Sequence, residues 1–190
     1  MELSGEKELI GSAQQGSVDA FEKLVIHYQD RLYRFLLARA ANRSDAEDAL
    51  QETFAAAFRY LPGYKPRYQF STWLFTIAIR KLYKSNQRLT VPLEEPATMA
   101  CQQPGPEQLG IQSETRHSIW KTAKTCLSDA QFTALWLFYV EELPHKEIGV
   151  AIKRPVSWVK VNLMRARRRL SRELRVDQFE YTVCHKEVTL

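Results

Sequence analysis

The chain has little of what defines several protein classes. Its 190 residues include only 3 cysteines, widely spaced, which argues against a disulfide framework and suits a reducing compartment. It has 7 glycines, 8 prolines and 45% apolar residues, which excludes a collagen-like, low-complexity or wholly disordered chain. No uncharged apolar run approaches the roughly 18–20 residues that cross a bilayer, and the first residues lack the pattern of a signal peptide. We therefore expect a folded cytoplasmic protein with no direct membrane insertion.

Motifs that carry chemistry are also missing. The sequence has no phosphate-binding glycine loop, no nucleophile motif and no metal-ligand spacing, and its 4 histidines are scattered. Cys184 and His185 are adjacent, but adjacency is not a standard zinc-binding spacing. We therefore expect a protein that is not an enzyme, with no catalytic residue, no cofactor and no metal site.

Basic residues are concentrated in two tracts that are almost free of acids. Seven lie between Arg59 and Thr90, where no acid occurs, and nine lie between Lys153 and Arg175, beside the single acid Glu173. One charge run by itself is usually a solvated surface. Two such tracts in separate parts of the chain favour a polyanionic partner, because neutralising phosphates supplies most of the non-specific affinity for nucleic acid.

An acidic segment separates the two basic tracts. From Pro92 to Glu114 the chain has four acids, no base and half of its prolines. Proline lacks the backbone N–H donor and restricts the residue before it, so we expect an extended linker here. The predicted order is a first domain, a linker, a second domain and a tail of unknown role, at residues 1–91, 92–113, 114–176 and 177–190.

Helical signals recur in both predicted domains, and strand signals do not. Capping patterns followed by apolar residues at helical spacing begin at Asp19, Ser44 and Ser128. The helix that opens at Ser44 has an apolar face that includes Phe58, and its opposite face is acidic. A Pro-Gly pair ends this helix, and Phe70 begins the next one. The sequence therefore predicts an all-α protein with two small helical domains.

Seven aromatic residues fall between Tyr60 and Tyr83, in the same stretch as the first basic tract. Aromatic rings stack on unpaired bases while Lys and Arg hold the backbone, which is how proteins grip single-stranded nucleic acid. For Trp73 and Phe75, packing in a core explains the residues at least as well. Four residues lie in a proline-punctuated loop where a core role is harder to arrange, and we expect nucleic-acid contact from these: Tyr64, Lys65, Arg67 and Tyr68.

The second domain ends in a helix-turn-helix pattern. A short helix is predicted from about Pro144 to Ile152, then a turn around Lys153–Pro155, then a helix from about Val156 to Arg175. Such a basic helix enters the major groove, with base contacts near its start and phosphate contacts later. A surface helix with solvated arginines is the alternative, which the shortage of acids disfavours. The face opposite the apolar stripe carries Ser157, Trp158, Lys160, Val161, Asn162, Arg165 and Arg168.

Four runs of sequence, taken in order, resemble one protein family. They are DAEDALQETF at 45–54, FSTWLFTIA at 70–78, LPHKEIG at 143–149 and VKVNLMRAR at 159–167. Together they are similar to bacterial RNA polymerase sigma factors of the sigma-70 superfamily, in the extracytoplasmic-function (ECF) group. The resemblance implies a region-2-like first domain and a region-4-like second domain.

The resemblance also implies partners and site residues. Core RNA polymerase would dock on the acidic helix, through Asp45, Asp48, Gln51, Glu52 and Phe54. The loop and helix that follow would capture a flipped base and hold the melted strand of the minus-ten promoter element, through Tyr64, Lys65, Arg67, Tyr68, Phe70, Trp73, Arg80, Lys84 and Arg88. The seven residues of the basic helix would read the minus-thirty-five element in duplex DNA. An anti-sigma factor is a further expected partner, and the acidic linker would pass through the polymerase channel.

Some positions depart from the family pattern. Arg80 and Lys84 stand where Asn and Asp are usual, and Trp158 and Val161 stand where the recognition helix usually has small or polar residues. Trp158 is therefore expected either to touch a thymine methyl group or to pack inward. Gly149 replaces a usual alanine, at a cost of about 1 kcal/mol in helix propensity.

Two other functions are weighed against a sigma factor. A helix-turn-helix regulator that binds duplex DNA without polymerase leaves the acidic helix and the aromatic loop unexplained. An enzyme that processes nucleic acid needs a carboxylate or metal cluster, which the basic tracts lack. The sequence therefore favours a sigma factor that directs promoter-specific initiation and strand opening, while the polymerase supplies the chemistry.

Overall fold

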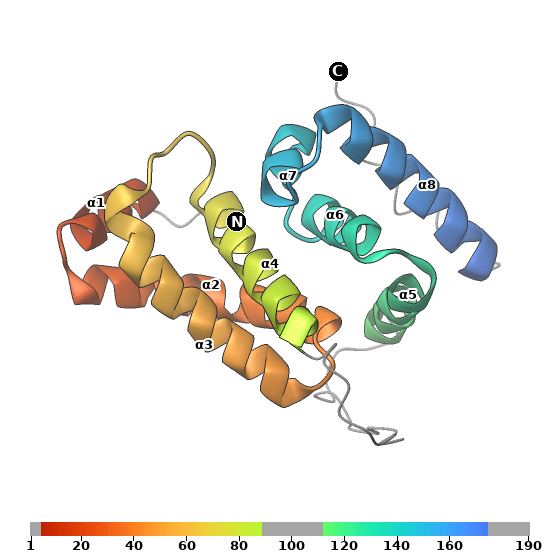
Figure 1. The fold of residues 1–190 in the computed structure, drawn as a ribbon, viewed down its shortest axis with the longest axis horizontal. Helices are drawn as coiled ribbons and strands as arrows, with labels where there is room; N and C mark the ends of the chain where they lie inside the picture. Colours follow the sequence, from red (N-terminus) through yellow and green to blue (C-terminus); the bar gives the residue numbers. More distant parts are fainter. Residues whose placement is uncertain (1–4, 89–111, 175–190) are drawn as a thin grey trace.

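A computed structural model of the chain describes residues 5–88 and 112–174. Every regular element within these two ranges is helical, which confirms the predicted all-α fold class (Figure 1). Most of the predicted linker and all of the tail at 177–190 lie outside the described residues. The elements are α1 (Glu6–Gln14), α2 (Val18–Arg39), α3 (Arg43–Tyr60), the 3-10 helix η1 (Leu61–Gly63), α4 (Phe70–Arg88), α5 (Gln112–Cys126), α6 (Asp129–Tyr139), α7 (His145–Ala151) and α8 (Val156–Leu174).

Helix starts follow the side chains that cap them. The capping box predicted at Ser128 is confirmed, because Ser128 and Gln131 each bond the other's backbone N–H. The caps predicted at Asp19 and Ser44 are wrong. The cap of α2 is Ser17, and the cap of α3 is Asn42, whose side chain accepts the N–H of Asp45 at 2.8 Å. Each helix therefore begins earlier than the sequence pattern suggests.

Helix α1 is an element that the sequence analysis did not predict. It packs on α2 through Ile10 and Ala13, which are buried, and the hydroxyl of Tyr28 donates to the carboxylate of Glu6. The amide nitrogen of Gln14 donates to the carbonyls of Leu61 at 3.1 Å and Tyr64 at 2.8 Å. Helix α1 therefore fixes the segment that leads from α3 to α4.

The first four helices enclose one apolar core. Leu24, Leu32, Phe35, Leu74 and Phe75 are fully buried, and the rings of Phe35 and Phe75 meet edge to face at 5.3 Å. Burying a side chain of this size contributes about 1.5–3 kcal/mol. This packing holds α4 against α2 and α3 and fixes which of its side chains reach the surface.

Helices α5 to α8 enclose the second part of the core. Its buried residues include Phe132 and Leu137 of α6, Ile148 of α7, and Leu163 and Leu170 of α8. Helices α7 and α8 form the predicted helix-turn-helix, and α8 runs along the side away from α4 (Figure 1). The other helices of this group therefore support α8 on one side, and its opposite side faces outward (Figure 1).

The turn between α7 and α8 requires a glycine. A Cβ atom at Gly149 would lie 2.7 Å from the carbonyl oxygen of Arg154, which is closer than real Cβ contacts come. Lys153 in the same turn has a φ of 55°, the left-handed region that most residues avoid. The glycine that lowers helix propensity is thus the residue that lets the turn close.

The two groups of helices pack against each other. Helix α7 lies against α4, and α5 lies against α2. Arg31 pairs with Glu141 at 2.7 Å, and Arg39 pairs with Asp129 at 3.0 Å. Glu141 is 6% exposed, and burial raises the pKa of its carboxyl group although Arg31 opposes that shift. The pair between Arg31 and Glu141 is therefore a largely desolvated contact between the two groups.

None of the helices between residues 5 and 88 or between 112 and 174 has both the length and the hydropathy that a membrane span needs.

Candidate nucleic-acid interface

The loop between η1 and α4 carries two exposed basic side chains on an aromatic base. Lys65 and Arg67 are exposed, and Tyr68 and Trp73 are half-buried. Arg80 is exposed further along α4, whereas the side chains of Lys84 and Arg88 lie outside the described residues. The loop therefore presents cationic groups beside partly accessible rings, the combination that binds a single strand.

Tyr64 is not a surface residue of this loop, and that expectation is wrong. Its side chain is 8% exposed, and its hydroxyl donates to the carbonyl of Tyr68 at 2.9 Å. Its ring meets those of Phe70 at 5.5 Å and Trp73 at 5.1 Å. Burial, more than the nearby Glu6, raises its pKa to about 12. Tyr64 was misplaced because η1 and Gln14 turn the loop back onto the core.

Phe70 is also buried, with 2% of its surface exposed. Its ring packs against Tyr28 on α2 and against Trp73 one turn further along α4. The structure thus contradicts direct contact between Phe70 and a base, because no face of the ring reaches the surface. Tyr64 and Phe70 form the support on which Trp73 rests.

Helix α3 presents the predicted acidic face. Asp48, Gln51 and Glu52 are exposed, whereas Asp45 and Phe54 are half-buried. The carboxylate of Glu52 also pairs with Lys81 of α4 at 3.0 Å. These five side chains lie on successive turns of one helix, so they form a continuous surface with acidic and apolar parts.

Phe58 on α3 differs from the prediction that placed it in the core. It is 45% exposed, and its ring meets that of Phe21 on α2 edge to face at 5.0 Å. Ala57 beside it is fully buried and Leu61 is 1% exposed, so Phe58 lies at the edge of the covered face of α3. The exposed ring continues the α3 surface toward the C-terminal end of that helix.

Helix α8 exposes most of the predicted DNA-reading residues. Its exposed face carries Ser157, Lys160, Val161, Arg165 and Arg168. The pKa of His145 on α7 is lowered, chiefly by partial burial and further by the positive charges of Lys160 and Arg167. The exposed face of α8 is therefore strongly cationic.

Asn162 does not belong to the exposed face of α8, and that assignment is wrong. It is 8% exposed, its amide nitrogen donates to the carbonyl of Trp158 at 3.0 Å, and its amide oxygen accepts from Gln131 of α6 at 3.1 Å. Trp158 is half-buried against the core, with the guanidinium of Arg154 5.5 Å from its ring centre. Two roles were expected for Trp158, contact with a thymine methyl group or inward packing. The buried part of its side chain packs inward against the core.

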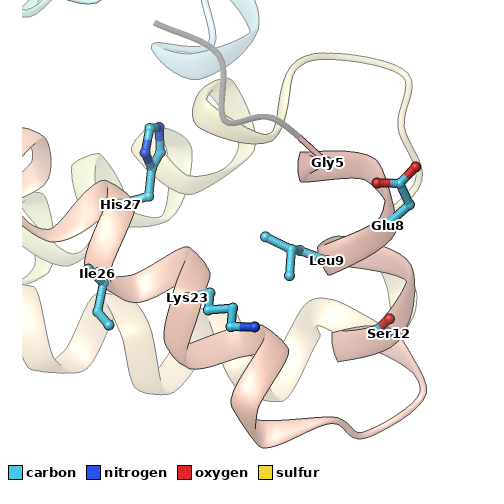
Figure 2. A pocket seen from close by; sticks show the side chains of 7 residues that line it. All are labelled: Gly5, Glu8, Leu9, Ser12, Lys23, Ile26 and His27. Carbon is cyan, nitrogen blue, oxygen red and sulfur yellow. The ribbon is translucent and has the colours of Figure 1, made fainter.

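A separate open pocket lies between α1 and α2, with a volume of about 590 Å³. Leu9 and Lys23 extend across it toward the opposite helix, as Figure 2 shows. None of the predicted binding residues lines this pocket. It therefore belongs to neither basic surface.

Both parts of the chain match known sequence families. The description "Sigma-70 region 2" fits residues 24–89, and "Sigma-70, region 4" fits residues 120–170. The ECF RNA polymerase sigma factor SigW of Bacillus subtilis (strain 168) is 30% identical over 181 residues, which cover 89% of this chain and 96% of SigW. The chain belongs to the ECF sigma factors of the sigma-70 family.

Other relatives and solved structures are similar to this sigma factor. The ECF RNA polymerase sigma-E factor of Escherichia coli (strain K12) is 27% identical over 174 residues, or 85% of this chain and 90% of that protein. CnrH, solved in complex with the cytosolic domain of CnrY, has a TM-score of 0.68 at 20% identity and covers 91% of this chain and 99% of its own. RpoE of Bartonella quintana, solved with the anti-sigma factor NepR, has a TM-score of 0.67 at 22% identity and covers 84% and 99%. The structural matches support the helical fold.

The two cationic surfaces of this sigma factor fall inside the two matched regions. The loop with Lys65 and Arg67 lies within region 2, and the exposed face of α8 lies within region 4. No group of three or more His, Cys, Asp or Glu side chains in the described part of the chain is arranged to hold a metal ion.

Proposed function

We propose that this sigma factor binds core RNA polymerase in the cytoplasm and directs it to promoters by contacting two separate elements of the DNA. The observation that carries this proposal is the pair of cationic surfaces, one on each group of helices and one in each matched region. The polymerase supplies the chemistry of RNA synthesis. This chain supplies promoter choice and the binding energy that stabilises unpaired bases, a few kcal/mol for each flipped nucleotide.

The acidic face of α3 is the proposed polymerase-binding surface. Its residues Asp45, Asp48, Gln51, Glu52 and Phe54 offer carboxylates and one apolar ring to a basic partner. The exposed ring of Phe58 extends this surface by one turn. An interface needs an apolar centre with a charged rim, and the α3 surface provides both.

The loop before α4 is the proposed site for the melted minus-ten strand. Lys65 and Arg67 contact phosphates, and Tyr68 and Trp73 offer ring surface to unpaired bases. Tyr64 and Phe70 act indirectly, by holding Trp73 and the loop in place. On α4 itself the proposed backbone contacts are Arg80, Lys84 and Arg88.

The exposed face of α8 is the proposed reader of the minus-thirty-five element. Ser157, Lys160 and Val161 lie at its N-terminal end, where a recognition helix meets base edges. Arg165 and Arg168 follow one and two turns later, where they neutralise phosphates. Asn162 supports this face from behind through Gln131.

An anti-sigma factor is the proposed regulatory partner. CnrH and RpoE of Bartonella quintana were solved with CnrY and NepR, and this chain shares their fold along most of its length. A protein that covers α3 or the loop before α4 would keep this chain from polymerase or DNA.

Reconstituted transcription tests the proposed function. Core polymerase mixed with this chain should start transcripts at discrete positions on fragmented genomic DNA, and core polymerase alone should not. The competing function, a regulator that acts without polymerase, predicts tight and specific binding of duplex DNA by the chain alone. Equal gel-shift affinities with and without core polymerase, together with no added transcripts, would reject the sigma-factor mechanism.

A further inference from the structure

We infer that the chain inhibits itself: Glu147 of α7 occupies the N-terminal end of α4 and keeps that end of the proposed minus-ten surface closed until the two groups of helices separate. This inference rests on the proposed function for its biological meaning. The closed state itself is a property of the structure and has its own test.

The contact joins one carboxylate to the start of the strand-binding helix. The carboxylate of Glu147 accepts the backbone N–H of Gln69 at 3.1 Å and the hydroxyl of Thr72. Thr72 is only 1% exposed. The first turn of α4 has no acid of its own, and its free N–H groups and positive dipole end favour an anion. Glu147 therefore caps α4 from the other group of helices.

This anion position lies within the proposed minus-ten surface. Gln69 and Thr72 directly follow the loop with Lys65 and Arg67, and Trp73 is the next residue of the helix. The backbone N–H and the hydroxyl that bond this carboxylate can equally bond a DNA phosphate, and the exposed Lys65 and Arg67 lie in the loop just before them. Glu147 thus occupies a position that a phosphate of the melted strand would need.

Three further contacts hold the second group of helices in place. Arg31 of α2 pairs with the buried Glu141, and Arg39 pairs with Asp129. The ammonium group of Lys124 donates to the carbonyl of Ala40 at 3.0 Å. All three join α2, or the residue after it, to α5, α6 or the segment after α6, so they would all break if the second group of helices moved away from the first as a unit.

The closed arrangement leaves the other two proposed surfaces accessible. The acidic face of α3 is exposed, and α8 runs along the side away from α4 (Figure 1). Polymerase can therefore dock on the closed form, while Glu147 still occupies the end of the minus-ten surface at Gln69 and Thr72. Opening then becomes a separate step, and the apparent affinity for a single strand falls in proportion to the open fraction.

Distance measurements test the closed state without DNA or polymerase. Spin labels at Gln29→Cys on α2 and Arg172→Cys on α8, in a chain whose native cysteines are serine, report the separation of the two groups of helices. The parent should give one narrow distance distribution. Glu147→Gln and, independently, Asp129→Asn should each add a population at longer distance. Glu173→Gln, which removes an exposed acid of α8 away from the contact, should not.

Binding of a single strand tests the consequence of opening. The probe is a fluorescent pool of random-sequence 12-nucleotide DNA strands, followed by anisotropy. If one chain in ten is open, Glu147→Gln should bind the pool about ten-fold more tightly than the parent, and Glu173→Gln should stay within two-fold of it. Adding Arg67→Ala to Glu147→Gln should abolish the gain.

The outcomes separate the two proposals. A distance distribution that Glu147→Gln and Asp129→Asn leave unchanged, or a parent that is already broad, overturns the closed state whatever the transcription assay gives. Longer distances without tighter strand binding refute inhibition of the minus-ten surface. Failure of polymerase-dependent transcription, with both effects present, counts against the proposed function alone.

Discussion

The backbone N–H of Arg154 donates to the carbonyl of Gly149 at 2.8 Å, and this hydrogen bond closes the turn of the helix-turn-helix. The bond brings the carbonyl of Arg154 to 2.7 Å from the point where a Cβ of residue 149 would lie. Only glycine fits that approach without a backbone shift, so the angle between α7 and α8 depends on this residue.

Gly149→Ala should therefore destabilise the second group of helices, although alanine favours helices. The clash should cost about 1–3 kcal/mol, as overpacking does, measured as a loss in the free energy of urea unfolding. Gly11→Ala in α1 is the matched control, because nothing lies within 4 Å of its added methyl group. That control should gain about 0.5–1 kcal/mol from backbone entropy. Equal effects of the two substitutions would contradict the close approach.

Asn162 and Lys160 should separate stability from DNA binding. Asn162→Ala should destabilise the fold by about 1–3 kcal/mol, because the half-buried amide of Gln131 loses its hydrogen-bond partner. Lys160→Ala should leave the free energy of unfolding unchanged and lower the slope of log affinity against log salt by about 1. Unfolding curves and DNA titrations at several salt concentrations measure the two effects. The reverse pattern would mean that the two side chains have been assigned to the wrong faces of α8.

The stability of the chain should depend on the protonation of His145. Partial burial, then Lys160 and Arg167, hold its pKa below the ordinary value of 6.5. As pH falls below 6.5, the unfolded chain binds a proton at this residue before the folded chain does, so the free energy of unfolding decreases. His145→Gln should lose less stability than the parent between pH 7.5 and 5.5. An NMR titration midpoint of this imidazole at or above 6.5 would reject the shift.

Charge reversal on α3 tests the polymerase surface. Asp48→Arg should weaken binding of core polymerase by about ten-fold or more, because it sets like charges against a basic partner. Glu22→Arg, an exposed charge reversal on α2, is the control and should bind as the parent does. Circular dichroism and affinity measurements on both variants check the result. If both variants lose affinity alike, the effect is one of net charge and not of this surface.

The sequence predicted the elements whose signals are local. The helix-turn-helix, the α3 acidic face and the Ser128 cap depend on residues a few positions apart, and the structure has all three. Tyr64 and Asn162 were misplaced because their burial depends on Gln14 and Gln131, which are distant in sequence. The contact of Glu147 with Gln69 and Thr72 spans more than 70 residues, so no periodicity indicates it.

Gln14 shows how a residue outside a recognised region can govern its geometry. The matched region 2 begins at residue 24, but the amide of Gln14 holds the carbonyls of Leu61 and Tyr64 from outside that boundary. A chimera that grafts residues 24–89 onto another sigma factor would carry every proposed strand-binding side chain. It would still lack the two hydrogen bonds from Gln14 that hold the loop bearing them. Domain exchanges in this protein should therefore be cut ahead of α1.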